Sequence, residues 1–255
     1  MNDQEIAEYL AKQIGQVLVD VQSANIENLT EEQLGAAGDL AGHECAIHEL
    51  SKLRPLDHIL SEEGEDNVGR LAANRVWIID PLDGTSHYSR GEAEFAVHVA
   101  LWQRGSSNPF QLEAAAISVP RKDLVIGINE QKSESRNAES IRILVSATRP
   151  PDEIDRVKKG LIEVFPEKGQ PVLIPMGSVG AKLASIIQGS ADLYLNTGGF
   201  YEWDIAAPAA VAKAHGLRVC DVTGVDLTFN NPDTFVPTAI IGKPEFVQVA
   251  IKSLA

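Results

Sequence analysis

WIIDPLDGT, residues 77–85, is the most informative stretch of this 255-residue chain. It opens with a short apolar run, which is typical of a strand buried on both faces. Pro81 and Gly84 then turn the chain, so we expect Asp80 and Asp83 on a rigid loop where the strand ends. Two carboxylates three residues apart on such a loop could share a cation. Taken alone, however, the pair favours a turn cap at Asp80 and an ordinary Asp-Gly turn at Asp83 and Gly84.

On both sides of this stretch, the hydrophobic pattern predicts alternating helices and strands. Apolar residues at three- and four-residue steps predict a helix over residues 3–21. A second helix is expected from about Asp39 to Leu53, with Leu40, Ile47 and Leu50 on its apolar side. The same reasoning gives strands at 76–79, 95–102, 114–119, 124–128, 141–146, 172–174, 193–195 and 239–241, and helices at 151–165, 178–188, 207–215 and from 244. Such alternation implies an α/β protein with layers of helices and sheets.

The most polar stretch of the chain, QKSESRNAES at residues 131–140, predicts a seam between two halves. We therefore expect an N-terminal α+β half over residues 1–133 that carries the DPLDGT loop. A C-terminal α/β half is expected over residues 134–255.

The composition excludes several classes of function. The chain has 22 Lys+Arg against 36 Asp+Glu, a formal net charge of −14. So acidic a protein lacks the basic face that binds a nucleic-acid polymer or an anionic membrane. No apolar run is long enough to span a bilayer, and charges interrupt the first 20 residues, unlike in a secretion signal. We expect a cytoplasmic protein.

Cysteine and histidine patterns offer no competing site. Cys45 and Cys220 lie far apart without metal-ligand spacing, and each is expected to be a small buried hydrophobe. The six histidines are scattered and are expected to be structural or solvated.

Three acidic segments add to the DPLDGT loop. Glu62 follows the apolar pair Ile59–Leu60, and Asp204 opens the small-residue helix DIAAPAAVAKAHG. Asp39 stands where the second helix is expected to begin, and there a helix cap is an equally open interpretation.

Together these segments resemble the lithium-sensitive, magnesium-dependent phosphatase superfamily that includes inositol monophosphatase and fructose-1,6-bisphosphatase. Within it, the chain is most similar to the CysQ-type 3′(2′),5′-bisphosphate nucleotidases. The similar segments occur in family order: SEEG (61–64), WIIDPLDGT (77–85), FAVHVALW (95–102), GSVGAK (177–182) and EWDIAAPAAVAKAHG (202–216). The resemblance implies an αβαβα sandwich, and dimers are common among relatives.

The resemblance also implies a site for two or three Mg²⁺ ions. Glu62, Asp80 and the backbone carbonyl of Leu82 would hold one ion, and Asp80, Asp83 and Asp204 a second. Such hard oxygen ligands suit Mg²⁺. Independently of the family, converging carboxylates would repel a phosphate and one another, so bound cations are needed to neutralise them.

The remaining implied roles concern the reaction. Thr85 and Glu62 would orient the attacking water, whose pKa a metal lowers. The amides of Gly84 and Thr85 would receive phosphate oxygens. Asp39 carries over as a third-metal ligand or a base for the water; this chain lacks the Lys and Thr that many relatives have beside it.

The same resemblance suggests the substrate, a small phosphate ester. Ser178, Lys182 and Arg149 would contact the ribose or second phosphate of a nucleotide; a helix cap, a surface lysine and a loop arginine are the alternatives. The implied reaction is hydrolysis of the 3′-phosphate of 3′-phosphoadenosine 5′-phosphate, with its 5′-phosphosulfate analogue as a further candidate. Hydrolysis of inositol 1-phosphate, or a catalytically weak metal-binding regulatory protein, remain alternative functions.

Overall fold

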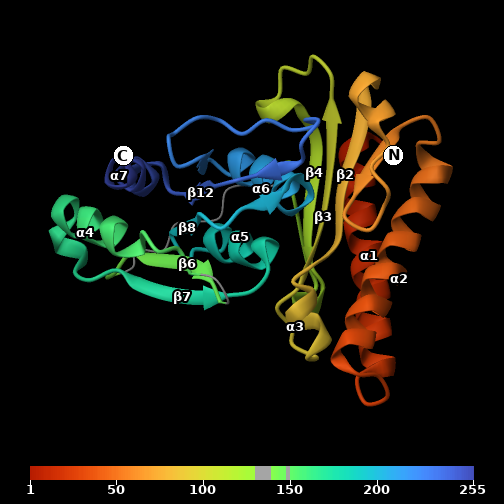
Figure 1. Cartoon of the computed structure of the whole chain (residues 1–255), viewed down its shortest axis with the longest axis horizontal. Coiled ribbons are helices and arrows are strands. Elements are labelled where there is room, and N and C mark those ends of the chain that lie inside the picture. The colour runs from red at the N-terminus through yellow and green to blue at the C-terminus, as the bar shows by residue number, and fades with distance from the viewer. Residues whose placement is uncertain (130–138, 148–149) are drawn as a thin grey trace.

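A computed structural model describes residues 1–129, 139–147 and 150–255. These residues form five alternating layers: a helix pair, a sheet, a second helix pair, a second sheet and a third helix pair (Figure 1). The αβαβα sandwich predicted from the sequence is therefore confirmed. The seam expected at 131–140 falls largely outside the described residues, and the division into two halves stays a prediction.

The first layer pairs α1 (Asp3–Asn25) with α2 (Glu31–Leu53). Both helices begin with a capping box, in which the side chains of Asn2 and Thr30 accept hydrogen bonds from the first turn. The apolar stripe predicted for α1 is buried against the first sheet, as shown by Ile6, Leu10 and Ile14.

The predicted start of α2 is wrong, because the helix begins eight residues before Asp39. Asp39 is therefore an interior residue of α2, and the helix-cap interpretation of it is wrong as well. The predicted apolar side is correct for Leu50, which is buried, but wrong for Leu40 and Ile47, which are 58% and 37% exposed.

Three glycines, Gly35, Gly38 and Gly42, make up half of the buried residues of α2. An added Cβ on Gly38 would lie 2.5 Å from the Tyr88 ring, and one on Gly42 would lie 3.1 Å from Pro81. The missing side chains let α2 approach the end of the WIIDPLDGT segment closely. A pattern based on apolar residues cannot detect this contact.

The first sheet has the order β1-β2-β3-β4-β5, with β1 and β2 parallel and the other neighbours antiparallel. Its second strand, β2, ends in the DPLD sequence, and the pairing with β3 shifts register between Asp80 and Asp83. Pro81, which lacks an N–H group, accounts for this irregularity. The strands are β1 (His58–Ser61), β2 (Arg75–Asp83), β3 (Ala96–Gln103), β4 (Leu112–Val119) and β5 (Leu124–Gly127).

The middle layer consists of α5 (Val179–Ile187) and α6 (Glu202–Ala214), which cover the sheet face opposite α1 and α2 (Figure 1). A core between the two sheets includes Ile78, Leu144 and Ile205. The structure starts α6 five residues earlier than the sequence predicted.

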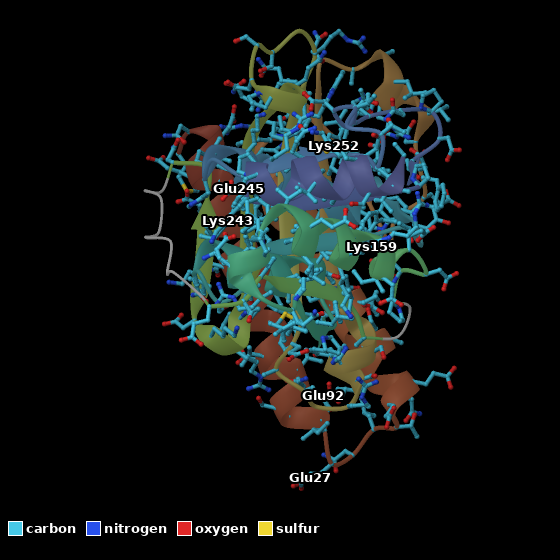
Figure 2. All side chains as sticks on the ribbon, turned by 90° about the vertical axis from the view of Figure 1, so that its left-hand side faces the viewer. Glu27, Glu92, Lys159, Lys243, Glu245 and Lys252 are labelled. Carbon is cyan, nitrogen blue, oxygen red and sulfur yellow. The ribbon has the colours of Figure 1, made fainter. Side chains whose placement is uncertain are left out.

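The second sheet has the order β10-β12-β8-β6-β7, and α4 (Ile154–Val164) and α7 (Pro244–Leu254) cover its outer side. Figure 2 views this outer face, where Lys159, Glu245 and Lys252 are exposed. The strands are β6 (Arg142–Ser146), β7 (Val172–Met176), β8 (Leu193–Asn196), β10 (Arg218–Cys220) and β12 (Ala239–Gly242).

Two further short elements are a ribbon and a helix. A two-stranded ribbon pairs β9 (Phe200–Tyr201) with β11 (Phe235–Val236), and a five-residue helix α3 (Thr85–Ser89) follows β2. Cys220 is buried as expected, whereas Cys45 is half-buried. No helix in the described ranges carries an apolar stretch that would cross a bilayer.

Candidate active site

Three carboxylates converge where β2 ends and α6 begins. One oxygen each of Asp80, Asp83 and Asp204 lies within 4.8 Å of the other two. Asp80 and Asp83 come from the bulged end of β2, while Asp204 stands in the first turn of α6. The packing of α6 on the first sheet brings these distant parts of the chain together.

Asp80 is the most deeply buried member of the cluster. Its Oδ1 accepts a hydrogen bond of 2.9 Å from the Leu82 amide, whereas its Oδ2 is buried without a hydrogen-bond partner among the described residues. Burial, and then the neighbouring Glu62 and Asp83, raise the pKa of Asp80 well above its ordinary value. A buried carboxylate oxygen that lacks a donor is a suitable ligand for a cation.

Asp83, in contrast, is well supplied with donors. Its Oδ2 accepts hydrogen bonds from the Ser178 hydroxyl at 2.5 Å and from the Gly180 amide at 2.9 Å. Burial opposes ionisation of Asp83, but His98 and these donors outweigh it and lower its pKa to about 2. Asp83 is therefore a carboxylate anion at neutral pH, which is the form that binds metal.

Glu62 follows β1 and lines the same space. Loss of solvation, and then the negative charge of Asp204, raise the pKa of Glu62 to about 8. This cluster of hard oxygen donors holds protons that a divalent cation would displace. The residues present therefore fit Mg²⁺.

Thr85 connects the end of β2, which carries Asp80 and Asp83, to α2. Its Oγ1 lies 3.1 Å from the Leu82 carbonyl oxygen and 3.3 Å from Oδ1 of Asp39. Burial, and then Glu63, raise the pKa of Asp39 to about 6. Asp39 thus lies beside the loop, although it is not a member of the carboxylate cluster found among the described residues.

Gly84 has a backbone conformation that favours glycine. Its φ is +96°, and an added Cβ would lie 2.9 Å from the Glu94 carbonyl oxygen. A side chain here would be strained and would crowd the cavity floor.

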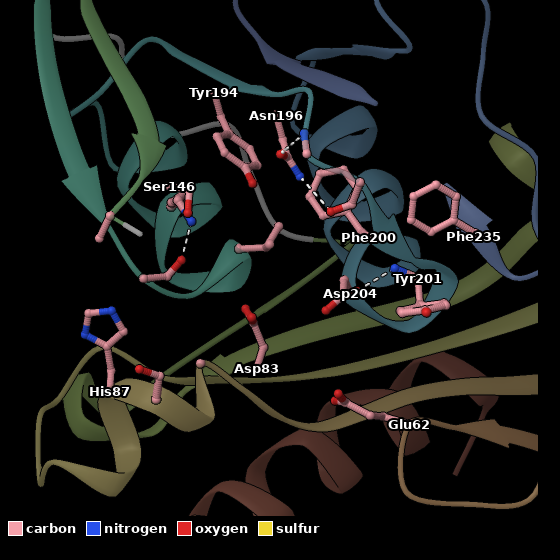
Figure 3. A pocket seen from close by; sticks show the side chains of 18 residues that line it. Glu62, Asp83, His87, Ser146, Tyr194, Asn196, Phe200, Tyr201, Asp204 and Phe235 are labelled. Carbon is pink, nitrogen blue, oxygen red and sulfur yellow. Dashed lines mark hydrogen bonds between the residues drawn. The ribbon is translucent and has the colours of Figure 1, made fainter. Parts of the chain in front are cut away.

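A cavity of about 480 Å³ opens above the carboxylates, between the loop after β2 and the start of α6 (Figure 3). Glu62, Asp83 and Asp204 lie at its acidic end. The remaining lining includes Lys182 and the rings of Tyr194, Phe200, Tyr201 and Phe235. A ligand that joins an anionic group to a planar ring could contact both the Lys182 side chain and the aromatic rings of this cavity.

The three residues that the resemblance assigns to substrate contact, Ser178, Lys182 and Arg149, have different outcomes in the structure. Ser178 caps α5 as the cap alternative predicted, and its hydroxyl also contacts Asp83. The surface-lysine alternative is wrong, because Lys182 is only 2% exposed; its Nζ donates to the Gly177 carbonyl and lies 4.9 Å from the Tyr194 ring centroid. Arg149 lies outside the described residues.

His98 is a site residue that the sequence reasoning missed. It is fully buried on β3, with Nε2 3.2 Å from Oδ2 of Asp83 and Nδ1 3.8 Å from Oδ2 of Asp80. Gly180 makes room for the ring, since its Cβ would lie 2.5 Å from Nε2 of His98. The available signal was one polar residue in the otherwise apolar strand FAVHVALW.

Comparison with known proteins gives matches over nearly the whole chain. The model of the inositol monophosphatase family matches residues 2–250. A 3′-phosphoadenosine 5′-phosphate phosphatase of Mycobacterium tuberculosis (strain CDC 1551 / Oshkosh) is 37% identical over 87% of this chain and 82% of its own length. The 3′(2′),5′-bisphosphate nucleotidase CysQ of Escherichia coli (strain K12) is 28% identical over 89% of this chain and 94% of its own.

Solved structures agree with the fold. CysQ from Bacteroides thetaiotaomicron has a TM-score of 0.75 at 22% identity, covering 95% of this chain and 98% of that chain. Inositol monophosphatase II from Staphylococcus aureus MSSA476 has a TM-score of 0.76 at 17% identity, covering 100% of this chain and 96% of that chain.

Proposed function

The chain belongs to the inositol monophosphatase family, and from this premise we propose that it is a Mg²⁺-dependent phosphatase that hydrolyses the 3′-phosphate of 3′-phosphoadenosine 5′-phosphate. The observation that carries the proposal is the cluster of three carboxylates, Asp80, Asp83 and Asp204, of which Asp83 and Asp204 line a cavity. The name and 37% identity of the mycobacterial relative support the choice of substrate.

The proposed metal ligands are those that the family resemblance implies. Glu62, Asp80 and the Leu82 carbonyl would hold one ion, and Asp80, Asp83 and Asp204 a second. Bound Mg²⁺ lowers the pKa of water and stabilises charge on the phosphoryl oxygens. The unpartnered Oδ2 of Asp80 supports its role between the two ions.

The protein groups around the loop would position the reactants. The Thr85 hydroxyl orients the water, and Asp39, 3.3 Å from it, accepts the proton that the water releases. A new bond forms between water oxygen and phosphorus while the bond to the 3′-oxygen breaks. The electron pair stays on the 3′-oxygen, which takes up a proton from solvent, Asp39 returns its proton to solvent, and adenosine 5′-phosphate and phosphate leave.

The rest of the cavity would bind the unreactive part of the substrate. Lys182 supplies positive charge for the second phosphate, and Arg149 is proposed to contribute a guanidinium there. Gly84 and Thr85 offer backbone amides to the phosphate being transferred. A 5′-phosphosulfate carries a similar charge at the same place, so 3′-phosphoadenosine 5′-phosphosulfate is proposed as a further substrate.

Phosphate release tests the proposal. We would compare 3′-phosphoadenosine 5′-phosphate with inositol 1-phosphate, each with Mg²⁺ and with a chelator. The expected result is Mg²⁺-dependent turnover that favours the nucleotide. Preference for the inositol ester would contradict the proposed substrate, and turnover of neither would contradict the proposed reaction.

A further inference from the structure

Two exposed aromatic rings lie side by side at the edge of the cavity (Figure 3). Tyr201 and Phe235 are each 48% exposed, and no other aromatic residue of the described chain is among its exposed large hydrophobics. Most large apolar surface is buried on folding. Adjacent exposed rings that border a cavity therefore point to a ligand that covers them.

The rings are held in place by regular structure. Tyr201 and Phe235 are directly paired across the ribbon of β9 and β11, with ring centroids 5.8 Å apart and an angle of 72° between the planes. Trp203 stacks on Tyr201 at 4.9 Å, nearly parallel at 14°. These neighbours limit the motion of the Tyr201 ring, so little conformational entropy remains to be lost on binding.

The loop before β9 passes close to the Phe235 ring, where only a glycine fits, and the ring is still 48% exposed. Gly199 has a φ of +80°, and a Cβ there would lie 2.4 Å from the Phe235 ring. The Asn196 amide fixes this loop: its Nδ2 donates to the Gly199 carbonyl at 3.3 Å, and its Oδ1 accepts from the Gly198 amide at 2.9 Å.

The aromatic pair is also tied to the carboxylate cluster. The Tyr201 amide donates a 2.6 Å hydrogen bond to Oδ2 of Asp204, as Figure 3 shows. Tyr201 and the proposed metal ligand Asp204 therefore lie in one short segment at the start of α6, and Phe235 is joined to that segment through the pairing of β11 with β9.

We propose that Tyr201 and Phe235 form a stacking platform for the planar base of the substrate, an inference that rests on the proposed function. A nucleobase has a flat π face, whereas the saturated inositol ring has none. Stacking of a base on an aromatic side chain is worth about 1–3 kcal/mol, or about 5- to 150-fold in affinity. The platform would thus favour nucleotides over inositol phosphates.

The test uses Phe235→Leu and Tyr201→Leu, which keep an apolar side chain but remove the ring. Phe235→Tyr restores a ring, and Val225→Ala alters another exposed apolar residue, one that does not line the cavity. Adenosine 5′-phosphate is titrated into each protein with Mg²⁺ present. KM and kcat are then measured with 3′-phosphoadenosine 5′-phosphate and with abasic 1-deoxyribose 3,5-bisphosphate.

We expect each leucine variant to bind adenosine 5′-phosphate about 5- to 150-fold more weakly and to show a matching rise in the nucleotide KM. Its kcat and its KM for the abasic ester should stay unchanged, and Phe235→Tyr and Val225→Ala should resemble the wild type. The abasic substrate separates lost stacking from a general disturbance of the site.

The outcomes distinguish the two proposals. If the leucine variants bind the nucleotide as tightly as the wild type does, the platform is refuted, even when hydrolysis upholds the proposed function. If the wild type binds the nucleotide but hydrolyses only inositol 1-phosphate, the function is refuted, and weaker binding by the leucine variants still supports the platform. A wild type that neither binds nor hydrolyses nucleotides overturns both.

Discussion

Asp83 differs from its neighbours in the cluster, because His98 and hydrogen-bond donors outweigh burial and lower its pKa, while burial and neighbouring carboxylates raise the pKa values of Asp80 and Glu62. The Ser178 hydroxyl and Gly180 amide occupy only Oδ2 of Asp83, so its other oxygen is available to a cation. The surrounding residues therefore give chemically similar carboxyl groups of one cluster different pKa values.

Replacing Asp83 with Asn should reduce kcat/KM at least about 100-fold, because loss of a ligand should cost no less than the 10- to 100-fold typical of residues that support ligands. Phosphate release, with thermal unfolding as a check on folding, measures the effect. Asp20→Asn, at an exposed position of α1, is the matched control. Full turnover by Asp83→Asn would exclude the proposed ligand role and revive the regulatory alternative.

Lys182 gives a prediction about pH. Desolvation lowers its pKa to about 8, so its positive charge is lost as the pH rises through 8. The KM for 3′-phosphoadenosine 5′-phosphate should therefore rise above pH 8. Lys182→Met should raise KM about 10-fold at pH 7, the scale of a charged hydrogen bond, and should lack this pH dependence. An unaltered KM profile in the variant would remove Lys182 from substrate binding.

At the scale of elements, the approach of α2 to the site depends on its glycines. Gly38→Ala should raise helix propensity by about 1 kcal/mol, but the added Cβ meets the Tyr88 ring at 2.5 Å. Overpacking costs about 1–3 kcal/mol, so we expect a net loss of stability and lower activity.

Urea unfolding of the Gly38→Ala variant measures this balance. Ala36→Gly, on the exposed side of α2, provides the control for propensity alone. A more stable Gly38→Ala protein would show that the close packing of α2 does not matter.

Elements with a regular apolar pattern were predictable from the sequence, as α1 and β2 show. The beginning of α2 was missed because its first turns bury one large apolar residue, Leu34, beside two glycines, Gly35 and Gly38. Asp80, Asp83, Glu62 and Asp204 were found through family resemblance, not through periodicity. His98 and Tyr201 were not found, because their importance depends on contacts between distant segments that a local pattern does not contain.

At the scale of the whole molecule, the raised pKa values of Glu62 and Asp80 link stability to pH. In the unfolded chain these groups lose their protons near pH 4, whereas the folded, metal-free protein retains them to higher pH, about 8 for Glu62. The resulting decrease in the free energy of unfolding is absent below pH 4 and grows as the pH rises toward 8.

Chelated protein should therefore become less stable between about pH 5 and pH 8, and Mg²⁺ should reverse the loss. A loss of about 1 kcal/mol in the free energy of unfolding would lower Tm by about 2–4 °C. Thermal unfolding at several pH values, with chelator or Mg²⁺, provides the measurement. Glu62→Gln should flatten the profile of the chelated protein; an equally steep profile would assign the pH dependence to other groups.

The origin of the three clustered carboxylates also bears on biosynthesis. Asp80 and Asp83 are made early, but Asp204 follows only after most of the chain has been synthesised. A nascent chain that ends before α6 has an incomplete set of ligands. If the proposed metal site is correct, its full set of ligands is therefore assembled only after α6 has docked on the first sheet, late in synthesis.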